Sequence, residues 1–173
     1  MDFFKAPEES RDERLTRLVE AYQKPLLDMC YIYLRDRELA EDAVQETFLK
    51  AYKAMSAFRG ESSEKTWLTR IAVNTCRDMR RSAWFRHVHR GITPEELPIP
   101  SGDGYDQSAI DVANAIMRLP DAYREVILLH YFQEMKLSEI SSITGMTASM
   151  VSRRIKKAHE ALHALLGKEY LYG

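Results

Sequence analysis

One stretch, LSEISSITGMTASMVSRRIKKA from Leu137 to Ala158, constrains the fold of this chain more than any other. Its isoleucines repeat at helical spacing, Ser138 can cap that first helix, and Gly145 can adopt the positive φ that ends a helix tightly. Thr147 can then cap a second helix. The stretch therefore predicts two short helices joined by a sharp turn, which is the layout of a helix-turn-helix.

The second of these helices is predicted to have one apolar side and one basic side. The apolar side is expected to hold Met150, Val151, Ile155 and Ala158. The outward residues are expected to be Ser149, Ser152, Arg153, Lys156 and Lys157, with Arg154 close by. Such a helix fits the major groove of B-DNA, where Arg and Lys can reach guanine edges while other cations hold phosphates. An ordinary helical hairpin with a solvated basic face has the same spacing, so both readings stay open.

The charges of the chain are balanced in number but unevenly distributed. The formal net charge of the 173 residues is −1 at pH 7. Cations gather between Arg77 and Arg90 and again between Arg153 and Lys157, and the segment between these two patches is acidic. This distribution is typical of a nucleic-acid-binding protein with two separate basic surfaces, although the total charge is not.

Cysteine usage and hydropathy predict an intracellular protein. Cys30 and Cys76 are far apart and neither belongs to a CxxC pair, which argues against a disulfide framework or a zinc knuckle. No apolar run approaches the roughly 20 residues of a membrane-spanning helix, and the charged first residues do not resemble a signal peptide. We therefore expect a cytoplasmic protein that binds no metal.

Three helices are predicted in the first half of the chain. Pro25 is expected to bend the first helix or to divide it into two. Asp36 can cap a second helix from Glu38 to Ala57, and Thr66 can cap a third that runs to about residue 83. The second helix is predicted to bury Ala40, Ala43, Val44, Thr47, Phe48, Ala51 and Met55.

The exposed side of that second helix is unusual. Three- and four-residue spacings bring together two acids, an amide and a leucine, namely Asp42, Gln45, Glu46 and Leu49. A face that is simply exposed to solvent would explain the charged residues but not the leucine. An exposed leucine among acids also suits docking onto a basic partner helix.

The third helix combines a core face with a cationic face. Its core face is predicted to hold Trp67, Ile71, Thr75 and Met79, with Leu68, Ala72 and Cys76 alongside. The opposite side carries Arg70, Asn74, Arg77, Asp78, Arg80 and Arg81, and Trp84 and Phe85 follow. Arginines can track phosphates, an amide can read a base edge and aromatic rings can stack on unpaired bases, so this face suits single-stranded DNA. Each aromatic residue by itself, Trp67 at helical spacing above all, is more typical of a core position than of a base-stacking one.

Residues 87–108 are rich in proline, glycine and acids and lack a helical period, which predicts a flexible acidic linker. Beyond the linker, one short helix ends before Pro120 and another begins at Asp121 and is apolar nearly all round. The sequence therefore predicts an all-α protein of two small helical domains, residues 12–86 and 109–168, with the helix-turn-helix in the second.

Together these stretches resemble the extracytoplasmic-function (ECF) group of bacterial RNA polymerase sigma factors, in the sigma-70 family. The resemblance covers about Leu15 to Leu166. AEDAVQETFLKAY, from Ala40 to Tyr52, is similar to the family's core-polymerase-binding motif, and KTWLTRIAVNTCRDMRR, from Lys65 to Arg81, to its promoter-melting and minus-ten-reading helix. LPDAYREVILLHY, from Leu119 to Tyr131, resembles with the helix-turn-helix its minus-thirty-five domain. The order and spacing of these motifs are more specific than any motif alone.

The resemblance implies a factor that binds core RNA polymerase and directs it to promoters, with no catalysis, cofactor or small-molecule substrate. It implies that the clamp helices of the largest polymerase subunit receive Asp42, Gln45, Glu46 and Leu49. The melted non-template strand at minus ten would contact Phe58, Ser62, Ser63, Lys65, Asn74, Asp78, Arg80 and Arg81. Duplex DNA at minus thirty-five would contact Ser149, Ser152, Arg153, Arg154, Lys156 and Lys157. An anti-sigma factor, in some cases membrane-bound, is a further expected partner and would hold the protein at the inner face of the membrane.

Two other classes of protein were weighed against this one. A repressor or response-regulator output domain would use the helix-turn-helix as a symmetric dimer on a palindromic operator, and it leaves the polymerase-like and melting-like helices unexplained. An enzyme has no support, because the sequence shows neither a phosphate loop, nor His and carboxylates at metal spacing, nor a nucleophile paired with a base.

Overall fold

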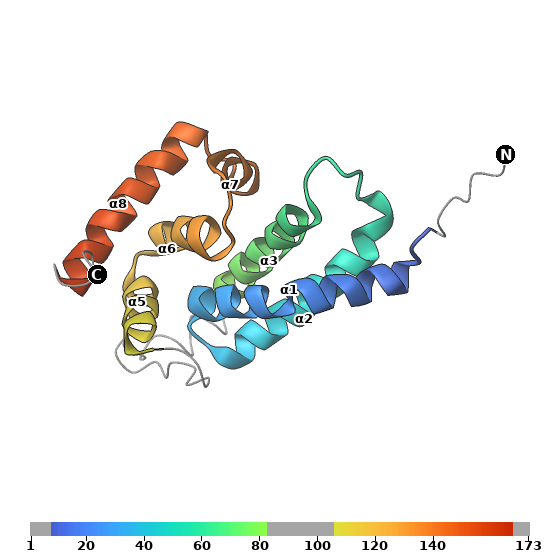
Figure 1. Ribbon diagram of the computed structural model, residues 1–173, viewed down its shortest axis with the longest axis horizontal. Helices are drawn as coiled ribbons and strands as arrows, with labels where there is room; N and C mark the ends of the chain where they lie inside the picture. Colours follow the sequence, from blue (N-terminus) through green and yellow to red (C-terminus); the bar gives the residue numbers. More distant parts are fainter. Residues whose placement is uncertain (1–7, 83–105, 168–173) are drawn as a thin grey trace.

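A computed structural model of the chain describes residues 8–82 and 106–167. Within these two ranges every regular element is a helix, which confirms the predicted all-α fold. The first range contains α1 (Arg11–Leu34), α2 (Arg37–Ala54), the 3₁₀ turn η1 (Met55–Ala57) and α3 (Glu64–Arg81). The second contains α5 (Gln107–Arg118), α6 (Asp121–Ile127), the π turn η4 (Leu128–Phe132), α7 (Leu137–Thr144) and α8 (Ala148–Leu166). The two groups of helices lie against each other, with α6 and α7 next to α1 and α3 (Figure 1).

The first helix, α1, is a single helix of 24 residues with Pro25 inside it. The expectation that Pro25 could divide it into two helices is therefore wrong. The proline removes one backbone N–H from the helix, but apolar residues before and after it, such as Leu18 and Leu26, are buried in the same core. Reciprocal hydrogen bonds between Ser10 and Glu13 form a capping box that begins the helix.

Helix α2 confirms its predicted cap and its predicted buried side. The Asp36 carboxylate accepts a hydrogen bond from the Leu39 backbone N at 2.9 Å. The buried residues are those predicted, namely Ala40, Ala43, Val44, Thr47, Phe48 and Ala51 of α2 and Met55 of η1, although α2 ends at Ala54 and not at the predicted Ala57. Alanines on this face allow α1 and α3 to approach α2 closely, and the three helices form the first domain.

Helix α3 begins earlier than predicted. The cap is Ser63, whose hydroxyl accepts from the Thr66 backbone N at 3.1 Å, so the predicted cap at Thr66 is wrong. Thr66 instead lies inside the first turn, is buried, and donates its hydroxyl to Glu139 at 3.1 Å. The fully buried side also differs slightly from the prediction, because Thr69 and Val73 are buried while Trp67, Ile71 and Met79 are half-buried.

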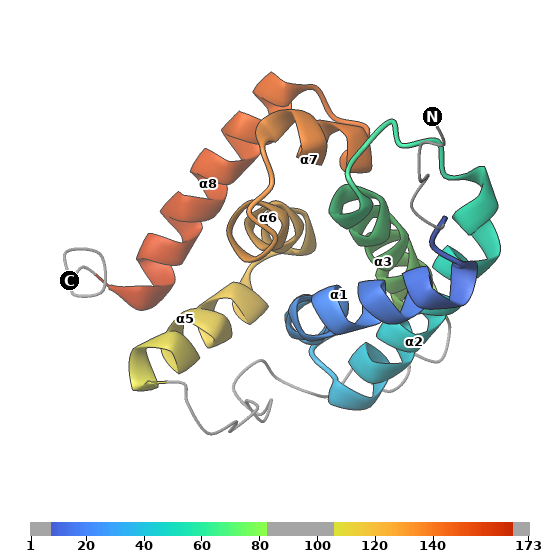
Figure 2. The same cartoon turned by 45° about the vertical axis from the view of Figure 1, so that its right-hand side comes forward.

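In the second group α5 and α6 precede the helix-turn-helix. The Asp106 side chain caps α5 by accepting from the Ala109 backbone N at 2.8 Å, so residues 107 and 108, predicted as linker, belong to this helix. Helix α6 continues directly into η4, and their apolar residues from Val126 to Leu129 are all buried. Figure 2 shows α6 between α8 on one side and α1 and α3 on the other. A helix that is apolar nearly all round needs such neighbours, although Tyr131 and Phe132 of η4 remain exposed.

The helix-turn-helix consists of α7 and α8. Gly145 ends α7 with a φ of +75°, and the Thr147 hydroxyl accepts from the Met150 backbone N to cap α8, as predicted. The predicted cap at Ser138 is wrong, because α7 already begins at Leu137. The Glu139 carboxylate accepts from the Lys136 backbone N at 2.8 Å and satisfies that end of the helix.

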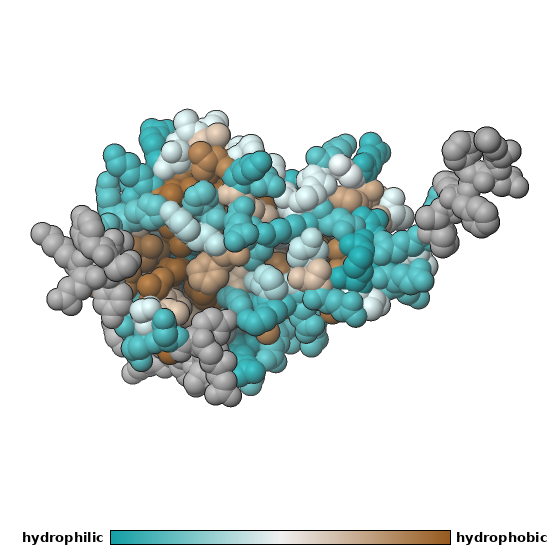
Figure 3. Space-filling view, in the orientation of Figure 1, coloured by the Kyte–Doolittle hydropathy of each residue, from teal (hydrophilic) through white to brown (hydrophobic). Residues whose placement is uncertain are grey.

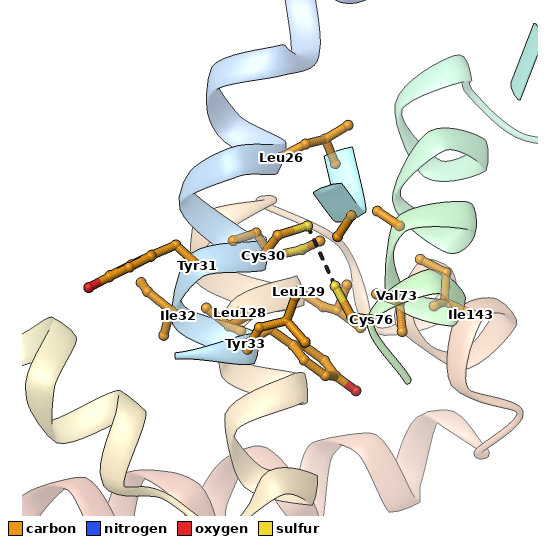
Figure 4. Close-up of a cluster of buried hydrophobic side chains, with 14 of the residues drawn as sticks. Leu26, Cys30, Tyr31, Ile32, Tyr33, Val73, Cys76, Leu128, Leu129 and Ile143 are labelled. Atoms are coloured by element: carbon orange, nitrogen blue, oxygen red, sulfur yellow. Dashed lines mark hydrogen bonds between the residues drawn. The ribbon is translucent and has the colours of Figure 1, made fainter. Parts of the chain in front are cut away.

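One buried apolar cluster joins the two groups of helices. It runs from α1, α2 and α3 into α6, η4, α7 and α8, and Figure 4 shows residues of both groups meeting in it. Cys30 and Cys76 lie in this cluster as free, buried thiols with their Sγ atoms 3.5 Å apart. The hydrogen bond to Cys30 and burial raise the pKa of the Cys76 thiol. On the face drawn in Figure 3, hydrophobic side chains gather over α5, α6 and α8, and hydrophilic ones cover most of the α1–α3 half.

Candidate nucleic-acid interface

The four predicted polymerase-contact residues share one exposed side of α2. Asp42 and Gln45 are exposed, and Leu49, with 55% of its surface exposed, is among the most exposed large apolar residues of the described chain. Glu46 is half-buried and forms an ion pair with Lys50, with 3.7 Å between Glu46 Oε1 and Lys50 Nζ. The arrangement offers a leucine ringed by carboxylates and an amide, which suits an apolar contact with a basic helix.

A small cavity lies between the loop after η1 and the start of α3. Its volume is about 180 Å³, and its lining residues are Ala57, Phe58, Arg59, Glu61, Ser62, Trp67 and Arg70. The rings of Phe58 and Trp67 stand with centroids 4.7 Å apart, and the Arg14 guanidinium lies 5.1 Å from the Phe58 centroid. Two predicted minus-ten residues, Phe58 and Ser62, therefore line one cavity that has both aromatic and charged walls.

The other predicted minus-ten residues occupy different positions along α3. Ser63 is the helix cap, and Lys65 is half-buried in the first turn. Asn74 and Asp78 are exposed on the outer face, as is Arg81 at the end of the helix. The structure thus brings Phe58 and Ser62 together in the cavity but spreads the remaining residues along two turns or more.

The arginines of α3 do not all project into solvent. The Arg80 guanidinium forms an ion pair with the Asp121 carboxylate at the start of α6. The Arg70 guanidinium donates to the Ser142 hydroxyl of α7 at 3.1 Å. Part of the cationic face of α3 therefore lies against the second group of helices.

A buried carboxylate is at the centre of this contact. Glu125, 9% exposed, accepts the Tyr33 hydroxyl at 2.6 Å and two hydrogen bonds from the guanidinium of Arg77. The bond to Glu125 raises the pKa of Arg77, and burial and the carboxylate together raise the pKa of Tyr33. Both partners of Glu125 belong to the first group of helices, so this one residue links α1 and α3 to α6.

The neighbouring Arg124 is almost completely buried. Its guanidinium donates to backbone carbonyls at the C-terminal end of α5 and to one at the end of α1, and it also contacts Asp121. The acceptors are the carbonyl oxygens of Ile116, Met117, Leu119 and Tyr33 and the carboxylate of Asp121. Burial, with a smaller effect of nearby Arg35, lowers the pKa of Arg124 to about 10. The sequence analysis assigned roles to neither Arg124 nor Glu125.

Helix α8 presents the predicted basic face. The exposed residues are Ser149, Ser152, Arg153, Lys156 and Lys157, and Arg154 is half-buried beside them. Val151, Ile155 and Ala158 are buried as predicted, but Met150 is 42% exposed, so its assignment to the apolar side is wrong. Met150 lies four residues before Arg154 and shares its side of the helix. With Tyr123 of α6 these residues line a cavity of about 250 Å³ that three cations border, Arg153, Arg154 and Lys157.

The described residues form neither a metal-binding cluster nor a helix that could span a membrane. No group of three or more His, Cys, Asp or Glu residues is arranged to hold a metal ion in residues 8–82 and 106–167. None of the helices there combines the length and the apolarity that crossing a bilayer requires. His130 is half-buried, with its Nδ1 atom 3.0 Å from the Met135 carbonyl oxygen. Trp84, Phe85, His87 and His89 lie outside the described residues.

Comparison with known proteins matches both halves of the chain. The Sigma-70 region 2 family model matches residues 18–86, and the Sigma-70, region 4 model matches residues 110–162. The RNA polymerase sigma-H factor of Pseudomonas aeruginosa is 30% identical over 162 residues, with 86% of this chain and 84% of the relative covered. The ECF RNA polymerase sigma factor SigW of Bacillus subtilis is 29% identical, with 86% and 87% covered.

A solved structure supports the fold. The sigma factor RpoE from Bartonella quintana, crystallised with the anti-sigma factor NepR, superimposes with a TM-score of 0.77 at 22% identity, over 91% of this chain and 99% of that chain. The part that matches region 2 carries the cavity beside α3 and the acidic stripe of α2, which consists of Asp42, Gln45, Glu46 and Leu49, and the part that matches region 4 carries the basic face of α8. The chain therefore belongs to the sigma-70 family of RNA polymerase sigma factors, in its ECF group.

Proposed function

We propose that this chain binds core RNA polymerase through α2 and places two DNA-reading surfaces, the cavity beside α3 and the basic face of α8, on a promoter. The observation that carries the proposal is that one chain combines these two surfaces with an exposed leucine, Leu49, that lies among the acids of α2. We take residues 12–86 as the polymerase-binding and minus-ten domain, the segment from residue 87 to the Asp106 cap as the linker, and the helices from α5 onward as the minus-thirty-five domain. The members of this family are initiation factors and not enzymes, and we propose no catalytic step for this chain.

The cavity beside α3 is the proposed minus-ten site. Extruding a base from a duplex costs a few kcal/mol, so a protein that captures one extruded base can favour melting without ATP. Phe58 and Trp67 offer ring faces for stacking, and Arg59 and Arg70 supply cations at the same cavity. Asn74 and Asp78, with Lys65, Arg80 and Arg81, would then track the non-template strand along α3.

The basic face of α8 is the proposed minus-thirty-five site. Ser149 and Ser152 lie near the start of the helix, where a recognition helix contacts base edges. Arg153, Lys156 and Lys157 follow on the exposed side and would hold phosphates or guanine edges.

An anti-sigma factor is the proposed regulatory partner. RpoE, which has a similar fold, was crystallised with the anti-sigma factor NepR. This chain also presents separate acidic and basic surfaces that such a partner could cover. We propose that the protein acts in the cytoplasm, at the inner face of the membrane where its anti-sigma factor is membrane-bound.

The test is co-elution of the purified protein with bacterial core RNA polymerase. The wild type is expected to co-elute, and the double variant Gln45→Ala, Glu46→Lys is expected to be lost from the complex, because the acidic stripe then carries a cation. The matched control is Glu20→Lys, Gln23→Ala, which makes the same changes at exposed positions of α1. Failure of the wild type to bind polymerase, with binding to duplex DNA as a dimer, would instead identify an operator-binding repressor.

A further inference from the structure

Met150 is an exposed apolar residue near the start of α8. It is the third residue of that helix, and 42% of its surface is exposed. In the turn before α8, Met146 packs against the buried cluster, whereas Met150 does not belong to that cluster of described residues. An exposed thioether gains free energy only when another apolar group covers it. Packing of the core therefore does not explain why an apolar residue stands at this position.

The side chain of Met150 lies at a cationic cavity bounded by α6 and α8, two helices that pack side by side (Figure 2). The other lining residues are the half-buried Tyr123 of α6 and the cations Arg153, Arg154 and Lys157. Met150 and Arg154 are four residues apart, so they share one side of the helix and lie about 6 Å apart along its axis. The apolar side chain is thus set among groups that attract phosphates and guanine edges.

The base edges in the major groove of DNA carry one apolar substituent, the C5-methyl group of thymine. The other bases present hydrogen-bond donors and acceptors there. A recognition helix holds its N-terminal residues against the base edges, and Met150 lies in the first turn of α8. Methionine is unbranched and has three rotatable bonds, so its end can adapt to the position of a methyl group. These features favour thymine over the other three bases.

We propose that Met150 determines sequence specificity at the minus-thirty-five site by covering the C5-methyl group of a thymine. The proposal rests on the proposed role of α8 and goes beyond it, because the cations of the basic face recognise acceptors and phosphates but no methyl group. Ser149 and Ser152 can donate to or accept from several base edges, so they discriminate weakly. The methyl contact therefore fixes at least one A·T pair in the element that this chain binds.

The test removes the methyl group from the DNA without changing the hydrogen bonds of the base pair. The purified full chain, alone and in complex with core polymerase, first selects duplexes from a random-sequence pool. In the selected duplex each thymine is then replaced, one at a time, by deoxyuridine, which lacks only the C5-methyl group. Affinities are measured by fluorescence anisotropy with a fluorescein label on the duplex.

One replacement should weaken binding of the wild type about fourfold, because covering one methyl group favours binding by about that factor. Met150→Gln keeps the length of the side chain but makes its end polar, so this variant should bind the thymine and deoxyuridine duplexes equally. Met150→Leu retains an apolar end and should still discriminate between them. Both substitutions fall at an exposed position, where effects on the fold are small.

The matched control on the same helix is Lys156→Ala. It removes an exposed cation that is not among the residues lining the cavity. This variant should weaken binding of both duplexes alike, so that their ratio stays about fourfold. A selected sequence without a fixed thymine, wild-type affinities that no deoxyuridine changes, or a ratio that persists in Met150→Gln would each overturn the proposal.

The two forms of the protein separate the thymine contact from the proposed function. A methyl effect in the chain alone, with no complex formed with core polymerase, would contradict the proposed function and support the thymine contact. A chain that binds polymerase but shows no methyl effect in either form would contradict the thymine contact and leave the proposed function intact.

Discussion

Arg124 is a charged residue in the interior of the protein, with 2% of its surface exposed. Its planar guanidinium donates to backbone carbonyls at the C-terminal ends of α5 and α1, which have no hydrogen-bond partner within their own helices. No other type of side chain has enough donors for this geometry. Burial disfavours the charged form, which is why the pKa of Arg124 falls to about 10. The residue is still protonated at neutral pH.

We predict that Arg124→Met lowers the free energy of unfolding by about 3 kcal/mol, because it leaves several buried carbonyls without a donor. Arg124→Lys should recover only part of this loss, since a single ammonium cannot reproduce the planar fork. The measurement is chemical denaturation at pH 7. Arg153→Met, at an exposed position of α8, is the control and should cost about 0.5 kcal/mol or less. Equal losses in the two methionine variants would contradict the structural role of Arg124.

Glu64 gives a pH-dependent contribution at the other end of the first domain. Its carboxylate forms ion pairs with the guanidinium groups of Arg17 and Arg14, each at 2.8 Å. The hydrogen bonds from these arginines lower the pKa of Glu64, and the one from Arg17 has the larger effect. Because the folded pKa is below the unfolded one, the stabilisation is complete above the ordinary carboxylate pKa of about 4.3 and is lost as the pH falls through the folded value.

Accordingly, Glu64→Gln should lower the free energy of unfolding at pH 7 by about 1 kcal/mol, and this difference should shrink as the pH falls below about 4.3 and through the lowered pKa of folded Glu64. Denaturation midpoints measured from pH 7 down to acid conditions test this. Glu20→Gln, at an exposed position of α1, is the control for the loss of one carboxylate. A difference between wild type and Glu64→Gln that persists unchanged into acid would refute the assignment.

At the scale of elements, α8 allows a prediction about phosphate contacts. Each phosphate contact releases a condensed counterion, so the slope of log K against log salt reports how many contacts a duplex makes. Lys156→Ala, Lys157→Ala should weaken binding of all duplex sequences alike and flatten the slope by about one unit per lost contact. Lys53→Ala, Lys136→Ala, at exposed lysines elsewhere, is the control and should leave the slope unchanged. An unchanged slope in the α8 variant would rule out phosphate contacts by these lysines.

The elements themselves were largely predictable, because their signals are local. Asp36 and Thr147 cap helices, and Gly145 takes a positive φ, as sequence rules require. One error among them has a distant cause. Ser63 and Thr66 can both cap α3. Ser63 is the cap, and the hydroxyl of Thr66 instead donates to Glu139, which is 73 residues away.

Only those parts of the candidate site that lie on exposed helix faces were predictable from the sequence. The stripe from Asp42 to Leu49 and the cations of α8 are exposed, and spacing on a helix is enough to place them. The cavity beside α3 was predictable only in part: Phe58 and Ser62 were expected to read DNA, but Trp67 was assigned to the core because its spacing fits a core face. A half-buried ring satisfies both patterns, so sequence periodicity alone cannot separate them.

At the scale of the whole molecule, the contact between the domains was not predictable. Arg77 and Glu125 are 48 residues apart, and on its own helix each has the pattern of an ordinary solvated charge. Only the packing of α6 against α1 and α3 brings them together and removes them from water. Buried ion pairs of this kind leave no periodic signal in a sequence, in contrast to apolar faces.

This contact also governs how the molecule should unfold. Because one buried cluster spans both domains, we predict that the wild type unfolds in a single calorimetric transition. In Asp121→Asn, Glu125→Gln the guanidinium of Arg77 loses the buried carboxylate of Glu125, and that of Arg80 loses the exposed carboxylate of Asp121. These losses fall on the interface and not on either domain's own core, so the variant should show two transitions, one for each domain. The variant Glu134→Gln, Glu160→Gln, which changes two exposed acids of the second domain, should keep the single transition. A wild type that already unfolds in two steps would show that the domains are not coupled.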